Sequence, residues 1–212
     1  MPHEMEAKLL VPDEATFEAL RQIDHIGRLR AIPKGSRLQQ DTYVDTASRR
    51  LLRAGYACRL RHTGHRAFAQ LKGLGEVRGA IHRRHEMDEE IDNPSIGCLL
   101  RDRAGVGQVV RRIAQGERVR PLFTVVTRRH AWDAWAGPTR CLEMALDRSS
   151  FFGGEEELMV LEVELESLDG DRALLEQASW ELRRRYRLAP TELTKFHRGL
   201  RCAGVAAGRV PT

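Results

Sequence analysis

The chain has 212 residues, of which 42% are hydrophobic and 31% are charged. That length and apolar content allow one domain with a substantial core. Its 35 basic and 30 acidic residues leave a net charge of only +5, and the two signs are interleaved along the chain. This balance disfavours a general nucleic-acid binder, which more often has a one-sided basic excess. It is compatible with a small, densely charged ligand.

The cysteines and the apolar runs exclude several other classes of protein. Cys58, Cys98, Cys141 and Cys202 are widely spaced and form no CxxC pair, which argues against a zinc cluster or a disulfide framework. The N-terminus lacks the apolar stretch of a signal peptide, and no apolar run is long enough to cross a membrane. We therefore expect a cytoplasmic protein.

The first half of the chain predicts one helix and then a series of short strands. Residues 3–12 (HEMEAKLLVP) read as a strand, or as a helix with Glu4 and Lys8 one turn apart. Residues 11–23 predict a helix that is capped by Asp13. A basic, irregular link is expected up to about Gly35. Strands follow at 37–46, 56–63, 66–73 and 82–91, separated by the turn segments TGH and GLGEVRG.

The second half returns to helices and then to strands. Residues 94–116 predict one or two helices, broken near Gly105 and Gly107. Strands are expected at 121–132, 139–153 and 157–167, a long helix at 169–188, and a turn with a short helix at 190–201. We predict one α+β domain over residues 1–202 with a flexible tail at 203–212. About eight mostly antiparallel strands permit a closed eight-stranded β-barrel with flanking helices.

Charged residues alternate with apolar ones in nearly every predicted strand, and alternate side chains share one face of a sheet. A single strand of this kind is typical of a sheet with one wet face, but here the polar face is short of neutral residues. If the sheet closes, the flanking helices need its apolar face outside, so the charged faces line the lumen. The pattern covers Glu4, Glu6 and Lys8; Tyr43 and Asp45; Arg59 and Arg61; Gln70 and Lys72; Arg84, Glu86 and Asp88; Glu143 and Asp147; Glu162, Glu164 and Glu166.

A lumen with both signs of charge indicates a ligand with both signs. Buried charges cost several kcal/mol each unless they are paired or bind ions. Carboxylates without His or Cys favour Mg²⁺ or Mn²⁺, and clustered Arg and Lys favour phosphate. Together they point to a metal-bound polyphosphate. The sequence has no GxGxxG and no GxxxxGK loop followed by Ser or Thr.

These segments resemble the CYTH family, the triphosphate tunnel metalloenzymes. Residues 4–8 have the ExExK form that opens these proteins, and the other segments follow in the family's order over about residues 3–200. Asp88 stands where the family has a last Glu, and Thr194 where it has Ser. The similarity is greatest to the CYTH half of bacterial inorganic triphosphatases that carry a second, helical CHAD domain. The matching segments are TYVDT, ACRLR, QLKG, HRRHEMD, VVTRRHAW, EMALD, EVELE and TELTKFHRGL.

The resemblance implies a role for each matching residue. Catalytic roles fall to Glu4, Glu6, Lys8, Arg59, Arg61 and Lys72. The triphosphate would be held by Lys8, Arg59, Arg61, Lys72, Arg84, Arg129 and Lys195. The metal would be bound by Glu4, Glu6, Glu86, Asp147, Glu162 and Glu164. Arg129 is preferred to Arg128 because its spacing to Trp132 fits the family pattern, while Tyr43 and Asp45 either bind or only brace the lumen.

The implied activity is hydrolysis of a terminal phosphoanhydride of inorganic triphosphate, with Mg²⁺ or Mn²⁺ and a carboxylate such as Glu4 or Glu6 to take the proton of the attacking water. ATP and thiamine triphosphate are further candidate substrates. A class IV-type adenylyl cyclase and a non-catalytic polyphosphate or nucleotide-binding module stay as alternatives, because fold alone does not choose among them. We expect no nucleic-acid or membrane partner, and a monomer or homodimer.

Overall fold

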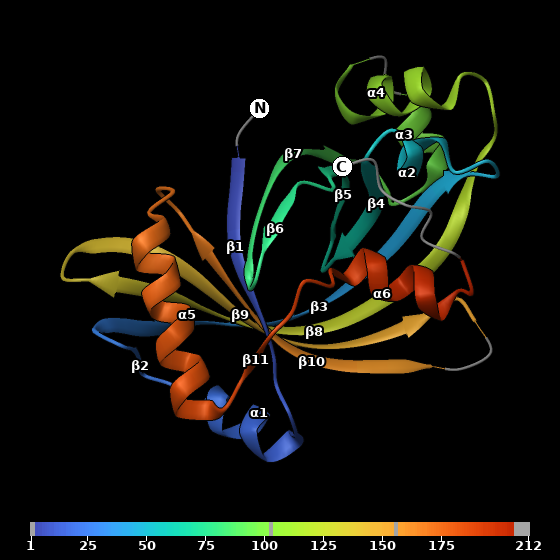
Figure 1. Ribbon diagram of the computed structural model, residues 1–212. Coiled ribbons are helices and arrows are strands. Elements are labelled where there is room, and N and C mark those ends of the chain that lie inside the picture. The colour runs from blue at the N-terminus through green and yellow to red at the C-terminus, as the bar shows by residue number, and fades with distance from the viewer. Residues whose placement is uncertain (1–2, 102–103, 155–156, 206–212) are drawn as a thin grey trace.

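The computed structural model describes residues 3–101, 104–154 and 157–205, which form one large antiparallel sheet with helices around it (Figure 1). The strands are β1 (His3–Leu10), β2 (His25–Ile26), β3 (Leu29–Thr46), β4 (Tyr56–Thr63), β5 (Arg66–Gly73), β6 (Glu76–Arg78), β7 (Ile81–Ile91), β8 (Val119–Ala136), β9 (Thr139–Phe152), β10 (Leu158–Ser167) and β11 (Ala189–Pro190). The helices are α1 (Glu14–Arg21), α2 (Arg50–Arg53), α3 (Ile96–Arg101), α4 (Gly105–Ala114), α5 (Arg172–Tyr186) and α6 (Lys195–Cys202).

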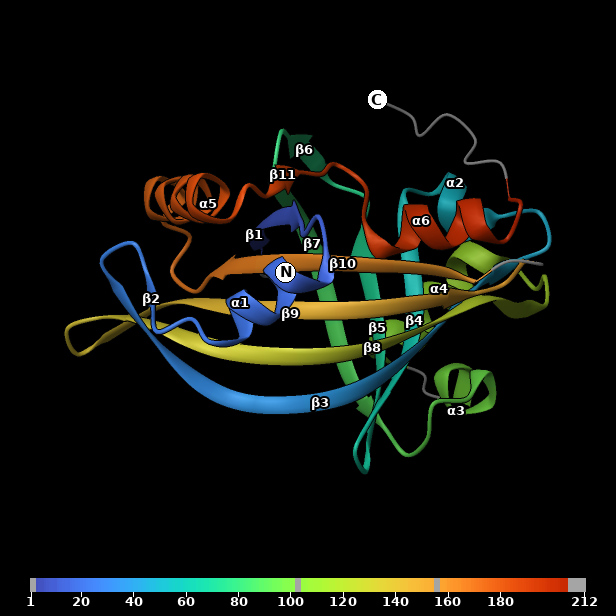
Figure 2. The ribbon, with the colours of Figure 1, turned by 90° about the horizontal axis from the view of Figure 1, so that it is seen from below.

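Eight of the strands close into a ring. The hydrogen-bonded order runs β1-β10-β9-β8-β3-β4-β5-β7, and β7 pairs again with β1. Every pair in the ring is antiparallel, and the long strands β3, β8, β9 and β10 curve together in Figure 2. The predicted eight-stranded antiparallel barrel is confirmed, and the first residues form a strand rather than a helix.

The apolar face of the barrel lies outside, where the helices cover it. On one side α1 and α5 pack on β1, β9 and β10, with Phe17 and Leu175 in one cluster with Leu9. On another side α2, α3 and α4 pack on β4 and β5, where Leu99 and Val110 share a second cluster with Leu60 and Leu71. Because these side chains alternate with the charged ones, covering them outside turns the charged residues inward.

Helix α6 differs from the others because it packs against inward-facing residues. Phe123 of β8 lies on the same strand face as Arg129, and its ring stacks on Tyr43 at 4.6 Å between centroids. Phe196 of α6 adds a third ring, 5.5 Å from Tyr43. Gly199 allows this approach, since a Cβ there would come within 2.0 Å of the Phe123 ring. Apolar packing thus fills the part of the lumen that faces α6.

Helices α1 and α6 begin after capping residues that are visible in the sequence. The Asp13 carboxylate accepts a hydrogen bond from the Thr16 backbone N–H at 2.7 Å and caps α1 as predicted. The 94–116 segment forms two helices, and the second begins at Gly105, with Gly107 inside it. The expected long helix is α5, and the expected short helix is α6, which Thr194 caps.

Four parts of the chain differ from expectation. The stretch up to Gly35 is not an irregular link: β2 forms at His25–Ile26, and β3 starts at Leu29 and pairs with β8 along most of its length, with a register shift between Pro33 and Gly35. Pro and Gly there hide the strand pattern, and a bulge accommodates them. The short elements α2, β6 and β11 were also not predicted.

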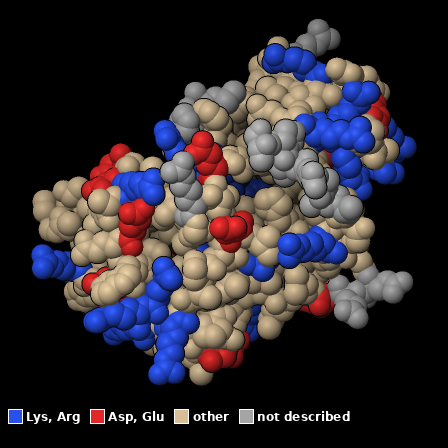
Figure 3. Space-filling model, in the orientation of Figure 1, with Lys and Arg blue, Asp and Glu red and all other residues tan. Residues whose placement is uncertain are grey.

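The first residues of the predicted tail, 203–205, contact the domain. Val205 donates its backbone N–H to the Leu200 carbonyl at 2.9 Å, and Ala203 and Val205 pack against the cluster around α6. Residues 206–212 lie outside the described residues. The described helices include none that is both long and apolar enough to cross a membrane. The face shown in Figure 3 carries dispersed charges of both signs, with basic side chains gathered where α3 and α4 lie.

Candidate active site

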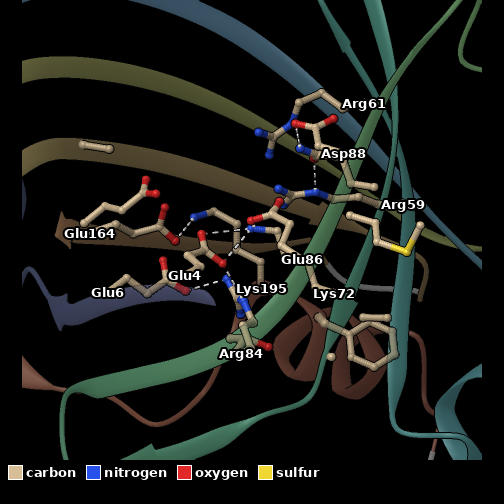
Figure 4. Close-up of a pocket in the computed structure, with 18 of the residues that line it drawn as sticks. Glu4, Glu6, Arg59, Arg61, Lys72, Arg84, Glu86, Asp88, Glu164 and Lys195 are labelled. Carbon is tan, nitrogen blue, oxygen red and sulfur yellow. Dashed lines mark hydrogen bonds and ion pairs between the residues drawn. The ribbon is translucent and has the colours of Figure 1, made fainter. Parts of the chain in front are cut away.

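The barrel encloses a cavity of about 890 Å³ whose walls include residues from all eight strands of the ring and from α6. Its charged lining, shown in Figure 4, contains acidic and basic side chains side by side. Most of these residues come from the alternate positions that the sequence pattern singles out. The lining includes Glu4, Glu6, Lys8, Arg37, Arg59, Arg61, Lys72, Arg84, Glu86, Asp88, Arg129, Glu143, Glu164, Glu166 and Lys195.

One group of charges lies where β1, β5 and β7 meet. The Lys72 ammonium is 3.1 Å from a Glu4 oxygen and 3.0 Å from a Glu86 oxygen. The Arg84 guanidinium donates to Glu4 at 2.8 Å and also pairs with Glu6. The cross-strand pairs Glu4–Arg84 and Lys72–Glu86 place these side chains on one face. Three carboxylates and two cations therefore form one network, which we call the first network.

A second network lies where β8, β9 and β10 meet α6. The Lys195 ammonium is 2.8 Å from Asp147 and 3.0 Å from Glu164, and it also pairs with Glu162. Arg129 donates to Asp147 at 2.8 Å and pairs with Glu164. Lys8 pairs with Glu164 and lies 3.0 Å from Glu6, so its ammonium links the two networks. Lys195 reaches this place because it is the first residue of α6.

The second network contains a group of oxygens suited to a cation. Asp147, Glu162 and Glu164 each offer an oxygen atom, and these atoms lie within 4.8 Å of one another. The Glu162 side chain is buried, and its Oε2 has no hydrogen-bond partner among the described residues. A set of carboxylate oxygens with one unsatisfied buried oxygen fits a hard divalent cation such as Mg²⁺ or Mn²⁺.

A third group consists of the paired arginines of β4 and a buried aspartate. Arg61 makes two hydrogen bonds of 2.7 Å to the two oxygens of Asp41. Arg59 lies 3.2 Å from the same carboxylate, and its Nε donates to Gln70 at 2.7 Å. The guanidinium of Arg59 also lies 3.4 Å from the Tyr43 hydroxyl. Asp41 therefore holds both arginines against the wall of the cavity.

Burial and ion pairing shift the pKa values of Glu4 and Lys195 in opposite directions. Burial raises the pKa of Glu4, but the nearby Lys72 and Arg84 outweigh it and hold that pKa well below its usual value. Burial lowers the pKa of Lys195, but Asp147, Glu162 and Glu164 raise it well above its usual value. Glu4 and Lys195 are therefore charged at neutral pH.

Glu166 differs from Glu4 in that its pKa is raised. It faces the lumen beside Glu6, its Cα partner on β1, and it forms no ion pair with the described residues. Burial, and then the neighbouring Glu4 and Glu6, raise the pKa of Glu166 to about 7. This carboxyl therefore titrates near neutral pH, unlike the carboxyl of Glu4.

Comparison with known proteins agrees with this geometry. The family model of the CYTH domain matches residues 2–200, nearly the whole chain. The chain is a CYTH protein. Members of this family are metal-dependent triphosphatases, so the family implies triphosphate ligands and divalent metals.

Solved structures share the fold of this CYTH protein at low sequence identity. A Hippeastrum protein, described as a putative adenylyl cyclase with a dominant triphosphatase activity, is 19% identical with a TM-score of 0.69, over 92% of this chain and 94% of that one. A putative adenylate cyclase from Bacillus halodurans is 18% identical with a TM-score of 0.63, over 93% and 98%. A Pyrococcus horikoshii protein is 16% identical with a TM-score of 0.54, over 92% and 98%.

The CYTH barrel brings all the site residues predicted from sequence into or around one lumen, but not all into one cluster. The six predicted metal ligands divide between the networks, with Glu4, Glu6 and Glu86 in the first and Asp147, Glu162 and Glu164 in the second. Arg129 points inward, whereas Arg128 is exposed.

The residues of uncertain role have distinct positions. Asp45 is buried outside the cavity lining and accepts hydrogen bonds from the backbone N–H groups of Leu51 and Leu52, so it caps α2. Tyr43 stacks on Phe123 and braces the wall. Asp88 accepts a hydrogen bond from Gln70 at 2.9 Å, and the Glu143 carboxylate pairs with Lys34 at 2.6 Å.

Two lumen residues were missed by the sequence argument. Asp41 precedes Tyr43 by two residues and so shares its face, a signal that alternation could have supplied. Arg37, the first residue of the strand predicted at 37–46, continues the same face and lines the cavity, so the same alternation could have indicated it.

Proposed function

We propose that this CYTH protein hydrolyses the terminal phosphoanhydride of a triphosphate, with inorganic triphosphate as its substrate. The observation that carries the proposal is the reciprocal pairing of charges inside the cavity. Nearly every lining cation is paired with a carboxylate in or beside the lining. Phosphate oxygens can replace the carboxylates at the cations, and a divalent ion can replace the cations at the carboxylates. A metal–triphosphate therefore satisfies both sets of groups at once.

The basic residues would bind and orient the phosphates. Arg59 and Arg61 offer planar forks that match phosphate oxygens, and Asp41 already orients them. Lys8, Lys72 and Lys195 would act as point charges within the same cavity. Their charge stabilises the transferred phosphoryl group as negative charge redistributes over its oxygens. Arg84 and Arg129 would complete this substrate-binding set.

The carboxylates would hold the metal and handle the proton. Glu4, Glu6 and Glu86, together with Asp147, Glu162 and Glu164, are the proposed ligands. When bound, Mg²⁺ or Mn²⁺ would lower the charge barrier between phosphate and nucleophile and acidify a water molecule. Glu4 or Glu6 is the proposed acceptor of the proton from the attacking water, because each faces the cavity as a charged carboxylate between cations.

The proposed preference for inorganic triphosphate rests on the many charged side chains of the cavity lining. Charged side chains from β1, β4, β5, β7, β8 and β10 line the cavity. The dominant triphosphatase activity described for the Hippeastrum protein agrees with hydrolysis rather than cyclisation.

The test is a substrate panel. Phosphate release would be measured from tripolyphosphate, ATP and thiamine triphosphate with Mg²⁺ or Mn²⁺, and cyclic AMP formation from ATP would be measured alongside. We expect tripolyphosphate to give the highest kcat/KM and Glu4→Gln to lower it at least a hundredfold, as for a group acting in proton transfer or metal binding (on the order of 10²–10⁴-fold). Glu18→Gln, on the exposed face of α1, is the matched control.

Two outcomes would contradict the proposal. Cyclic AMP as the main product from ATP would make the protein a cyclase. Absence of turnover on the whole panel, with tripolyphosphate binding and its metal dependence unchanged in Glu4→Gln, would make it a binding module.

A further inference from the structure

Arg37 is the one arginine or lysine of the described cavity lining that has no carboxylate within ion-pair distance. Each of the other lining cations pairs with at least one acid: Lys8, Arg59, Arg61, Lys72, Arg84, Arg129 and Lys195. The guanidinium of Arg37 also makes no hydrogen bond to the described residues. Its donors are therefore free for a ligand.

The surroundings of Arg37 favour an anion. Its Cα partner across the strands is Arg129, and Arg61 is the other nearby cation. The nearby acids are already engaged: Glu143 by Lys34 and Arg140, and Asp147 by Arg129 and Lys195. Arg37 therefore adds, beside Arg61 and Arg129, a positive charge that no ion pair with the described residues balances.

Arg37 also occupies the outer end of its strand face. Gln39, Asp41 and Tyr43 follow it along the inward face of β3, and all three are buried, whereas Arg37 is exposed. At the other end of this face Tyr43 packs under Phe196 of α6. A phosphate chain that lies on Arg59 and Arg61 along this wall therefore has Arg37 at its outer end.

We propose that Arg37 is a specificity-determining residue that binds the outer phosphate of the substrate and favours an unesterified phosphate there. This inference rests on the proposed binding of a triphosphate in the cavity. An unesterified terminal phosphate carries about −1.5 to −2 charges at pH 7, whereas an esterified one carries a single negative charge and a bulky group. A free guanidinium fork gains more from the former, because it can form two charge-assisted hydrogen bonds to one group.

The test compares two arginines of the same strand pair. Arg37→Gln removes the proposed contact. Arg128→Gln makes the same charge change on an exposed residue, whose Cα partner Leu38 is the neighbour of Arg37. Dissociation constants for tripolyphosphate and for ATP would be measured by titration calorimetry with Mg²⁺, and kcat/KM would be measured for both. Arg37→Lys, which keeps the charge and loses the fork, is the conservative variant.

We expect Arg37→Gln to weaken tripolyphosphate binding about tenfold, as for loss of one charge-assisted contact, and ATP binding by no more than about threefold. Arg37→Lys should fall between wild type and Arg37→Gln, and Arg128→Gln should change neither ligand. Equal weakening of both ligands, or equal effects of Arg37→Gln and Arg128→Gln, would overturn the inference. Selective binding without turnover would contradict the proposed hydrolysis alone. Absence of triphosphate binding in the wild type would contradict both.

Discussion

Lys195 lies among three buried carboxylates and illustrates how single residues balance charge in this lumen. Its ammonium pairs with Asp147, Glu162 and Glu164 and is itself buried. A buried acid cluster is costly unless a cation neutralises it. Cations of the chain balance these acids, and Lys195 provides more of these pairs than Arg129 or Lys8.

Replacing Lys195 with Met should therefore destabilise the protein and make it more dependent on metal. We expect a loss of about 3 kcal/mol in the free energy of unfolding, as when one partner of a buried ion pair is removed. Mn²⁺ should raise the melting temperature of Lys195→Met more than that of the wild type, because the carboxylates lack their ammonium. Thermal unfolding with and without Mn²⁺ checks this.

The matched control for Lys195→Met is Lys34→Met. Lys34 also pairs with two acids, Asp133 and Glu143, but at a half-exposed position, where an ion pair contributes about 1 kcal/mol or less. An Mn²⁺ response of Lys195→Met equal to that of the wild type would argue against a cation site at these three acids.

His197 provides a pH-dependent prediction. Burial, and then the nearby His82, lower the pKa of His197. A histidine with a lowered folded-state pKa binds fewer protons than in the unfolded chain, so its unfavourable contribution appears as the pH falls below about 6.5. His197→Gln should lose less stability than the wild type between about pH 7 and pH 5.

Urea unfolding at a series of pH values measures this difference. His65→Gln, in the exposed turn between β4 and β5, is the control and should follow the wild-type profile. Parallel profiles for the wild type and His197→Gln would show that the His197 ring does not contribute to acid sensitivity.

At the scale of elements, α6 packs on the barrel and also places a residue in the cavity lining. It packs on the inward face through Phe196 and Leu200 and carries Lys195 as its first residue. Thr194 caps the helix by accepting a hydrogen bond from the His197 backbone N–H at 3.3 Å. The position of the Lys195 ammonium therefore depends on how this one helix begins.

Thr194→Ala and Asp13→Ala remove N-caps from α6 and α1, respectively. Each should lower stability by about 1 kcal/mol. Only Thr194→Ala should also lower the triphosphatase kcat/KM, because α6 begins in the cavity lining and α1 does not. Steady-state kinetics and urea unfolding of both variants test this, and equal activity of the two variants would contradict the role given to the start of α6.

Several strands and α6 were predictable from local patterns, and others were not. Alternation indicated β1, β4, β5, β9 and β10 because part of each strand has charged residues on one face and apolar residues on the other. The beginning of β3 was hidden, because Pro33 and Gly35 are poor strand residues and pair with β8 only through an irregular register. Helix α2 was hidden because its cap, Asp45, lies five residues before its first residue.

For the whole molecule, the cavity exists only when the ring is closed. Its lining includes residues from all eight ring strands, α4 and α6, and the pairing of β1 with β7 joins the ends of the ring. A ligand that bridges these strands binds the folded barrel and not the unfolded chain. Ligand binding should thus stabilise the entire domain rather than one part of it.

Tripolyphosphate with Mg²⁺ should raise the free energy of unfolding by about 2.7 kcal/mol at a hundred times its dissociation constant. Differential scanning calorimetry would record this as one transition that moves to higher temperature. Sodium sulfate at equal ionic strength is the control and should have a much smaller effect. A shift of the same size with sulfate would indicate general anion screening instead of a triphosphate site.

The sequence by itself determined that charged and apolar residues alternate along the strands, and hence that a closed sheet with outer helices has a charged lumen. It also indicated Glu4, Glu6, Arg59, Arg61 and Lys72, because a side chain's face follows from its parity in a regular strand. Only the tertiary structure decided which charges meet. The register between strands distant in sequence divides the acids into two networks, places Asp41 between two arginines and leaves Arg37 unpaired among the described residues. Local sequence patterns carry no information on that register.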